Sequence, residues 1–169
     1  MLDKINVSCV FKAYFKCLKD SKGNKNYCDY FLFFIFPGVF SILGLYLHVK
    51  LTEKIVPTLL SIVALSVPLL ISILILMYNL GQNTKNTGKT SDKELQVDIA
   101  KETSVVLIYI ILLCVFTTIS LGILSLNNGI NETMTIICSL IVFYLIVAIV
   151  LNILMVLKRL HVLISKSFE

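Results

Sequence analysis

The polar stretch Asn79–Thr103 reads NLGQNTKNTGKTSDKELQVDIAKET and separates two apolar halves of the chain. Two long apolar runs precede it and two follow it, and each has about the 20 residues that a helix needs to cross a bilayer. The four runs occupy residues 30–49, 55–78, 104–126 and 134–157. The sequence therefore predicts an all-α, four-transmembrane-helix membrane protein of two antiparallel hairpins, joined by the polar stretch as a loop.

The composition is that of a membrane protein with short ends. Of the 169 residues, 57% are hydrophobic, and the mean hydropathy is +0.92. A soluble domain is closer to about half apolar. Outside the spans lie a lead-in over residues 1–29, the loop 79–103 and a tail over residues 158–169. We therefore expect one membrane domain over residues 30–157 and no separate soluble catalytic domain.

The basic residues are unevenly distributed, and their distribution predicts the topology. The lead-in carries six Lys, the polar loop four, and the tail three Lys or Arg, whereas the two short outer turns carry two and none. Cytosolic segments of membrane proteins are enriched in Lys and Arg. We therefore expect a multi-pass protein of the inner (plasma) membrane, with both termini and the loop 79–103 facing the cytosol.

The lead-in contains an amphipathic helix between Leu2 and Leu18. Aromatic and aliphatic residues such as Phe11 and Tyr14 recur on one side of it, and lysines occupy the other side. A basic face opposite an apolar face is typical of an interfacial helix that lies in the headgroup region. A helix packed under the membrane domain is an equally good interpretation. In the interfacial case, the lipid-headgroup candidates are Lys12, Lys16 and Lys19.

The polar loop has two parts. Gly81–Thr90 resembles a phosphate-binding loop at first sight, but six residues instead of four separate Gly81 from Gly88, and no strand precedes it. This part is predicted to be a flexible linker. In the second part, the capping-box pattern Ser91-x-x-Glu94 predicts the start of a helix that runs into the third span.

The groups that would carry chemistry are missing from the spans. None of the four spans contains Asp, Glu, Lys or Arg, whereas proton-coupled transport needs an ionisable group within the membrane. The five Cys residues form no C-x-x-C pair, and the tails lack the aromatic and basic alternation of single-strand binders. We therefore expect no catalytic residue, cofactor, metal site or direct nucleic-acid binding, and no enzyme activity.

Small and polar residues recur at steps of three and four along each span, so each set lies on one helix face. Such faces are typical of close helix–helix packing, in which hydroxyls and amides bond across the contact. They would equally line a polar pore built from several copies. The candidates for either role are Ser41, Gly44, Pro68, Ser72, Thr118, Gly122, Tyr144 and Asn152.

In plan, the chain resembles the membrane subunit of the bacterial anti-phage system Kiwa. The likeness rests on the four spans and on the basic segments Lys12-x-x-x-Lys16-x-x-Lys19 and Lys158-Arg159. It covers the whole chain but is architectural, and no short motif transfers a functional residue. The resemblance implies a homo-oligomeric membrane sensor that responds to envelope disturbance at infection and recruits a cytosolic DNA-binding effector.

The sequence leaves several non-enzymatic functions open. The leading one is a sensor and scaffold subunit that contacts membrane lipids, forms a homo-oligomer and recruits a soluble cytosolic protein. Its docking candidates are the charged positions before the third span, namely Asp92, Lys93, Glu94, Asp98 and Lys101. The alternative is an oligomeric pore-forming effector that depolarises the membrane. A third function is a solute transporter with helices broken at Pro37 and Pro68.

Overall fold

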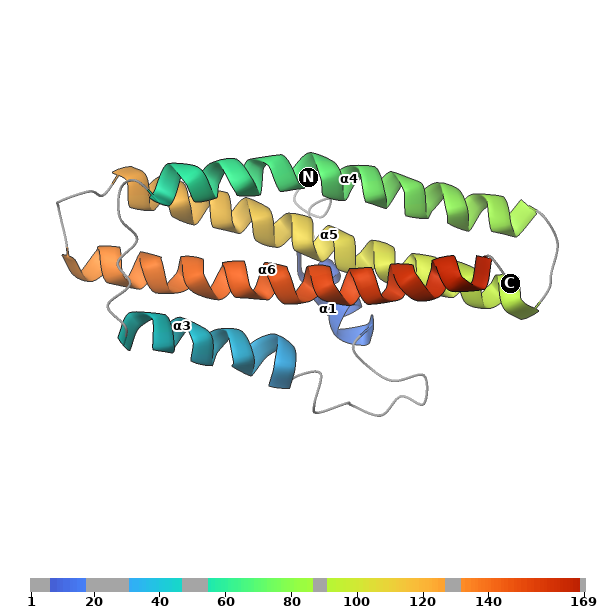
Figure 1. Cartoon of the computed structure of the whole chain (residues 1–169), viewed down its shortest axis with the longest axis horizontal. Helices are drawn as coiled ribbons and strands as arrows, with labels where there is room; N and C mark the ends of the chain where they lie inside the picture. Colours follow the sequence, from blue (N-terminus) through green and yellow to red (C-terminus); the bar gives the residue numbers. More distant parts are fainter. Residues whose placement is uncertain (1–6, 18–30, 47–54, 87–90, 127–131, 168–169) are drawn as a thin grey trace. The chain divides into compact units, whose positions relative to one another are not determined.

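The computed structural model describes residues 7–17, 31–46, 55–86, 91–126 and 132–167, and all of these residues are helical (Figure 1). The all-α prediction is confirmed for this part of the chain. In chain order the elements are α1 (Val7–Cys17), the π-helical turn η2 (Phe31–Ile35), α3 (Phe36–Tyr46), α4 (Ile55–Asn86), α5 (Ser91–Leu126) and α6 (Glu132–Ser167).

Three of the helices are long and apolar enough to cross a membrane. The qualifying segments are Ile55–Gln82 in α4, Val97–Ser125 in α5 and Thr135–His161 in α6. Many of their large apolar side chains are exposed; Leu65 and Leu69, for example, are 70% and 66% exposed. A water-soluble protein rarely leaves so much apolar surface uncovered, whereas a bilayer covers it. The described part of the chain is thus all-helical, and its long apolar helices are of membrane-spanning type.

The first expected span differs from a single regular helix. The apolar segment Phe31–Gly44 is shorter than the other three, and the residues that would complete the span, 47–49, lie outside the described part. It begins as a π-helical turn and becomes α-helical at Phe36. Pro37 explains the change, because a proline lacks the N–H group and its ring crowds the carbonyl four residues earlier. A wider turn before the proline relieves that conflict.

The expected loop 79–103 is largely helical. α4 continues through Pro68 and on to Asn86, so the prediction of a flexible linker is wrong for Gly81–Asn86. Residues 87–90 lie outside the described part. α5 begins at Ser91 and runs unbroken to Leu126, which confirms the continuous helix predicted from the capping box. Its 36 residues correspond to about 54 Å at 1.5 Å per residue, well beyond the roughly 30 Å of a hydrocarbon core.

The chain divides into two compact units, and each long helix contributes to both. Unit 1 comprises residues 1–26, 69–111 and 152–169, and unit 2 comprises residues 27–68 and 112–151. In described elements, unit 1 holds α1 with the second part of α4, the first part of α5 and the end of α6. Unit 2 holds η2 and α3 with the remaining parts of the three long helices.

Unit 2 is built on apolar contacts, and a side-chain hydrogen bond joins two of its helices. Its core cluster consists of residues from α4, α5 and α6, namely Val56, Leu121, Leu124 and Val142. α3 is joined to α6 by Ser41, whose hydroxyl donates to the backbone carbonyl of Leu140 at 2.7 Å. Ser41 is 1% exposed, and a Cβ atom at Gly44 would lie 3.9 Å from the Phe143 ring. Small residues thus allow α3 to approach α6 closely.

The buried residues of α4 recur at intervals of seven. They are Val56, Val63, Leu70 and Met77, all less than 9% exposed. A seven-residue interval keeps one narrow seam on a helix face, as in helices that pack at small crossing angles. Because the seam is narrow, most side chains around α4 are not buried against the other helices.

Candidate functional site

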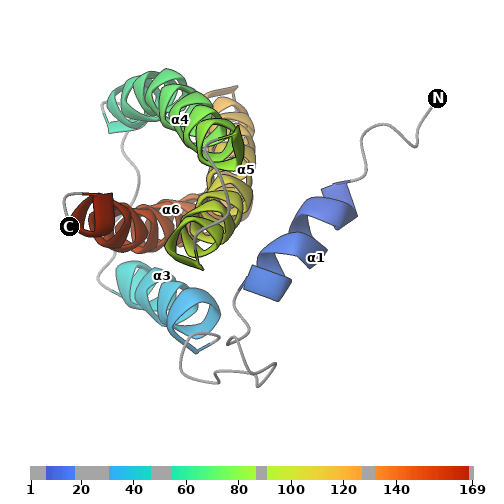
Figure 2. The same ribbon diagram turned by 90° about the vertical axis from the view of Figure 1, so that its right-hand side faces the viewer.

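The apolar face of α1 packs on α5 within unit 1. Tyr14 is 1% exposed, and its ring stacks on that of Tyr109 with centroids 3.9 Å apart and an interplanar angle of 19° (α1 is the short blue helix of Figure 2). Phe11 meets the same Tyr109 edge to face, with centroids 5.5 Å apart. Aromatic pairs in these two geometries stabilise a contact beyond the area they bury. An 11-residue helix, marginal on its own, is held in this way.

The hydroxyl of Tyr14 reaches the one Asn within the apolar part of α6. It donates to Oδ1 of Asn152 at 2.7 Å, and Asn152 is 2% exposed. An amide buried among apolar side chains is costly unless it is hydrogen-bonded. Tyr14 supplies that bond from a separate helix, so Asn152 serves as an anchor for α1 in this structure.

The end of α1 is held by a guanidinium from α6. Nη2 of Arg159 donates to the carbonyl oxygen of Cys17, the last residue of α1, at 3.4 Å. The last carbonyls of a helix have no partner within it, and a cation there also opposes the negative end of the helix dipole. Arg159 therefore caps α1 from outside.

The same guanidinium forms an ion pair with α5. Its Nη1 atom lies 3.2 Å from Oε2 of Glu102, and the side chains of Arg159 and Glu102 are 20% and 53% exposed. Nη1 is buried and does not meet hydrogen-bond geometry at this distance, so the contact is primarily one of charge. We call the set Tyr14, Tyr109, Asn152, Glu102 and Arg159 the α1 clamp.

The clamp shows what the apolar face of the amphipathic helix contacts in the structure. Its apolar face, expected at the headgroup boundary, covers protein in unit 1, which corresponds to the second interpretation of the lead-in. Lys12 is exposed. The side chain of Lys16 and the whole of Lys19 lie outside the described part, so the lipid-headgroup prediction is left with Lys12.

The stripe candidates of unit 2 divide into contact and non-contact positions. Ser41 and Gly44 lie at the α3–α6 contact. Thr118 donates its hydroxyl to a carbonyl of its own helix at 2.8 Å, and Tyr144 is half-buried. A Cβ atom at Gly122 would meet nothing within 4 Å. The pair Thr118 and Gly122 thus does not mark a close helix–helix approach at the glycine.

The candidates of α4 lie on the side opposite to its buried seam. Pro68 and Ser72 are each two positions from the buried Leu70, which is about 200° around an α-helix of 3.6 residues per turn. Both are exposed, and so are Ser61 and Asn79 on the same side of α4. A face with hydroxyl and amide groups turned away from the helix's own packing seam is suited to contact with another helix.

The docking candidates are described at two positions. Asp98 and Lys101 form an ion pair one turn apart on α5, with 3.3 Å between Nζ and Oδ1 and side chains that are 71% and 64% exposed. Both are therefore accessible on the charged part of α5. The remaining candidates are helical in backbone, but their side chains lie outside the described part: Asp92, Lys93 and Glu94.

The clamp itself was not found by sequence reasoning, although the sequence carries signals for it. Tyr14 and Asn152 belong to separate patterns in the sequence, the apolar face of the lead-in helix and the polar stripe of the fourth span. Glu102 and Arg159 stand just outside the third and fourth spans and carry opposite charges. Opposite charges beside two spans, and a tyrosine hydroxyl with an amide inside a span, are the signals for these contacts, but neither signal says which residues meet.

The described residues contain no group of three or more His, Cys, Asp or Glu side chains that could hold a metal ion. The clamp offers positioning and charge, and it has no nucleophile paired with a base. Comparison of the chain with protein-family models, curated proteins and solved structures gives no match.

Proposed function

We propose that this protein is a non-enzymatic sensor and scaffold of the bacterial inner membrane, with four spans and both termini in the cytosol. In this proposal it forms a homo-oligomer and recruits a soluble cytosolic protein. The observation that supports it best is the ion pair between Glu102 and Arg159. Glu102 belongs to the charged part of α5, whereas Arg159 caps α1, so a partner bound to α5 acts on a helix junction within the membrane protein.

Oligomer formation is supported by the exposed face of α4. In a bilayer, the exposed amide of Asn79 and the exposed hydroxyl of Ser61 gain from contact with another protein helix. Ser61 donates to the carbonyl of Pro57 at 2.9 Å, which lowers the cost of its exposure. Asn79 has the larger polar group and is the position at which a neighbouring copy gains most.

The setting we propose is defence against phage, which is supported by the likeness in plan to the Kiwa membrane subunit. A phage-sensitive host that carries the gene with its flanking genes should form fewer plaques than the same host without it. Equal plaque numbers would argue against defence while leaving the scaffold proposal standing.

Recruitment is tested by reversing the charges on α5. We expect gently solubilised, tagged wild-type protein to bring down one cytosolic partner in fixed stoichiometry. The variant with Lys or Glu of opposite charge at positions 92, 93, 94, 98 and 101 should lose that partner, because charge complementarity governs such docking. Replacing the exposed Lys12 by Glu serves as the control, since it lies on α1. Loss of the partner in the control, or its retention in the variant, contradicts docking on α5.

The alternative, a pore-forming effector, is favoured by one observation, the exposed polar face of α4. Asn152, in contrast, is bonded to Tyr14 and buried. If copies line a pore with α4, overexpression should dissipate the membrane potential, and Asn79→Leu should restore it at least partly. A dye that reports membrane potential measures this directly. An unchanged potential on overexpression rejects the pore and leaves the scaffold.

A further inference from the structure

A groove lies between α4 and α5 within unit 1, and it belongs to neither the α1 clamp nor the exposed face of α4. Its volume is about 440 Å³. Ligand pockets usually have roughly 300 to 1,000 Å³, so the groove can hold part of a small molecule. Its floor is apolar because it is formed by Met77 and Ala100. These two side chains are 1% and 3% exposed.

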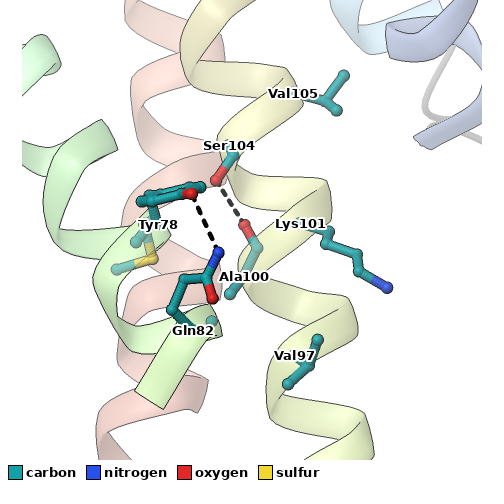
Figure 3. Close-up of a pocket in the computed structure, with 9 residues that line it drawn as sticks. Tyr78, Gln82, Val97, Ala100, Lys101, Ser104 and Val105 are labelled. Carbon is teal, nitrogen blue, oxygen red and sulfur yellow. Dashed lines mark hydrogen bonds between the residues drawn. The ribbon is translucent and has the colours of Figure 1, made fainter. Parts of the chain in front are cut away.

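The rim of the groove is polar. Figure 3 shows Tyr78 and Gln82 of α4 facing Ala100 and Ser104 of α5. Nε2 of Gln82 donates to the Tyr78 hydroxyl oxygen at 3.0 Å, which leaves the tyrosine proton and the second amide proton available as donors. The Ser104 hydroxyl donates to the Ala100 carbonyl at 2.8 Å, and its oxygen can still accept a hydrogen bond. Two donors therefore stand at the edge of an apolar trough.

One cation borders the groove. Lys101 is among its lining residues, and Figure 3 shows its side chain extending away from Tyr78 and Gln82, along the outer side of α5. Its Nζ atom pairs there with Asp98 at 3.3 Å. Because both side chains are mostly exposed, the pair is weak, and the flexible lysine can turn to another anion. The described charged side chains of unit 1 are four basic and two acidic, namely Lys12, Lys101, Lys158 and Arg159 against Asp98 and Glu102.

The position of the groove indicates its occupant. The apolar segment of α4 ends at Gln82 and that of α5 begins at Val97, and both residues line the groove. The groove thus lies at the level where hydrocarbon gives way to headgroups, where lipid is the abundant molecule. Tyr78 is 64% exposed there, as is typical of aromatic side chains at a membrane boundary.

We propose that this groove binds an anionic phospholipid. The beginning of its acyl chains lies on Met77 and Ala100, and its phosphate accepts hydrogen bonds from Tyr78, Gln82 and Lys101. The uncharged donors and the apolar floor would accept any phospholipid. Lys101 and the excess of basic side chains in unit 1 favour a lipid with a negatively charged headgroup. This inference needs only a membrane-spanning chain and does not depend on the sensor function.

The test uses the full chain in phosphatidylcholine vesicles doped with a photoactivatable phosphatidylglycerol. We expect cross-links to concentrate on the peptides that cover residues 77–105, and unlabelled phosphatidylglycerol to compete where phosphatidylcholine does not. The double variant Tyr78→Leu with Lys101→Gln should label these peptides about tenfold less, since it removes two donors to one phosphate. The matched control is Tyr46→Leu, an exposed tyrosine in unit 2, and it should label as the wild type does.

Three results overturn the proposal. They are equal labelling by a photoactivatable phosphatidylcholine, unchanged labelling in the double variant, and competition by inorganic phosphate, which indicates an anion site and not a lipid site. If the double variant is poorly folded, Lys101→Gln alone decides the charge preference, because its side chain is exposed. Tyr78 is not among the proposed partner-docking positions. Tyr78→Leu alone should therefore weaken lipid labelling and leave partner recruitment unchanged, which separates the two proposals.

Discussion

Replacing Tyr14 by alanine is expected to release α1 from unit 1. The change removes the ring that stacks on Tyr109 and the hydroxyl that bonds Asn152. Truncating a buried aromatic side chain costs about 3 to 5 kcal/mol, so detached α1 becomes at least about a hundredfold more populated. Trypsin cleavage after Lys12 measures this, because a protease cuts α1 only when the helix opens.

Tyr14→Phe separates the hydroxyl from the ring. The stack on Tyr109 remains, and the variant loses the hydrogen bond to Asn152, which contributes about 0.5 to 1.5 kcal/mol. Cleavage after Lys12 should rise about tenfold, less than in the alanine variant. Tyr46→Phe is the matched control, since Tyr46 is 83% exposed, and it should change nothing.

A double variant tests whether Tyr14 and Asn152 act as a pair. If they do, Tyr14→Phe combined with Asn152→Leu costs less than the sum of the two single changes, because each single change already breaks the same bond. Strictly additive costs mean that the two side chains stabilise the protein independently. Unchanged cleavage after Lys12 in Tyr14→Ala would show that something else holds α1.

The long helices could be predicted from the sequence because they are encoded locally. Uninterrupted apolar runs define α4, α5 and α6, and the capping-box pattern at Ser91 marks where α5 begins. Helix ends were predicted less well. α4 continues to Asn86 across Gly81, because neither a glycine nor a run of polar residues ends a helix unless another structure competes. The π-turn before Pro37 likewise depends on a steric conflict that hydropathy does not report.

The clamp could not be predicted from local patterns because its contacts join distant parts of the chain. Tyr14 and Asn152 are 138 positions apart, and Arg159 and Cys17 are 142 apart. The amphipathic pattern of α1 shows that it needs an apolar surface, but a lipid boundary and a protein groove offer equivalent surfaces. The bond to Asn152, which local patterns do not show, is what joins α1 to protein in the structure.

Arg159→Gln is expected to have the next largest effect, because one guanidinium makes two contacts. The change removes the charged donor to the Cys17 carbonyl, and hydrogen bonds to charged groups contribute about 1.5 to 3 kcal/mol. A loss of about 2 kcal/mol raises cleavage after Lys12 roughly thirtyfold. Lys158→Gln, at the adjacent exposed position, is the matched control.

Glu102→Gln isolates the ion pair from the cap. Glu102 is half-exposed, so this change should cost only about 0.2 to 1 kcal/mol, and its effect should shrink as salt is added. The exchange Glu102→Arg with Arg159→Glu restores opposite charges but places a carboxylate at the C-terminal end of α1, where the helix dipole is unfavourable. The exchange should therefore restore only part of the stability lost in Glu102→Arg or Arg159→Glu alone. Full rescue would mean that the hydrogen bond to the Cys17 carbonyl contributes nothing, because a glutamate at position 159 cannot donate it. An Arg159→Gln variant as stable as the wild type would remove the proposed link between the charged part of α5 and α1.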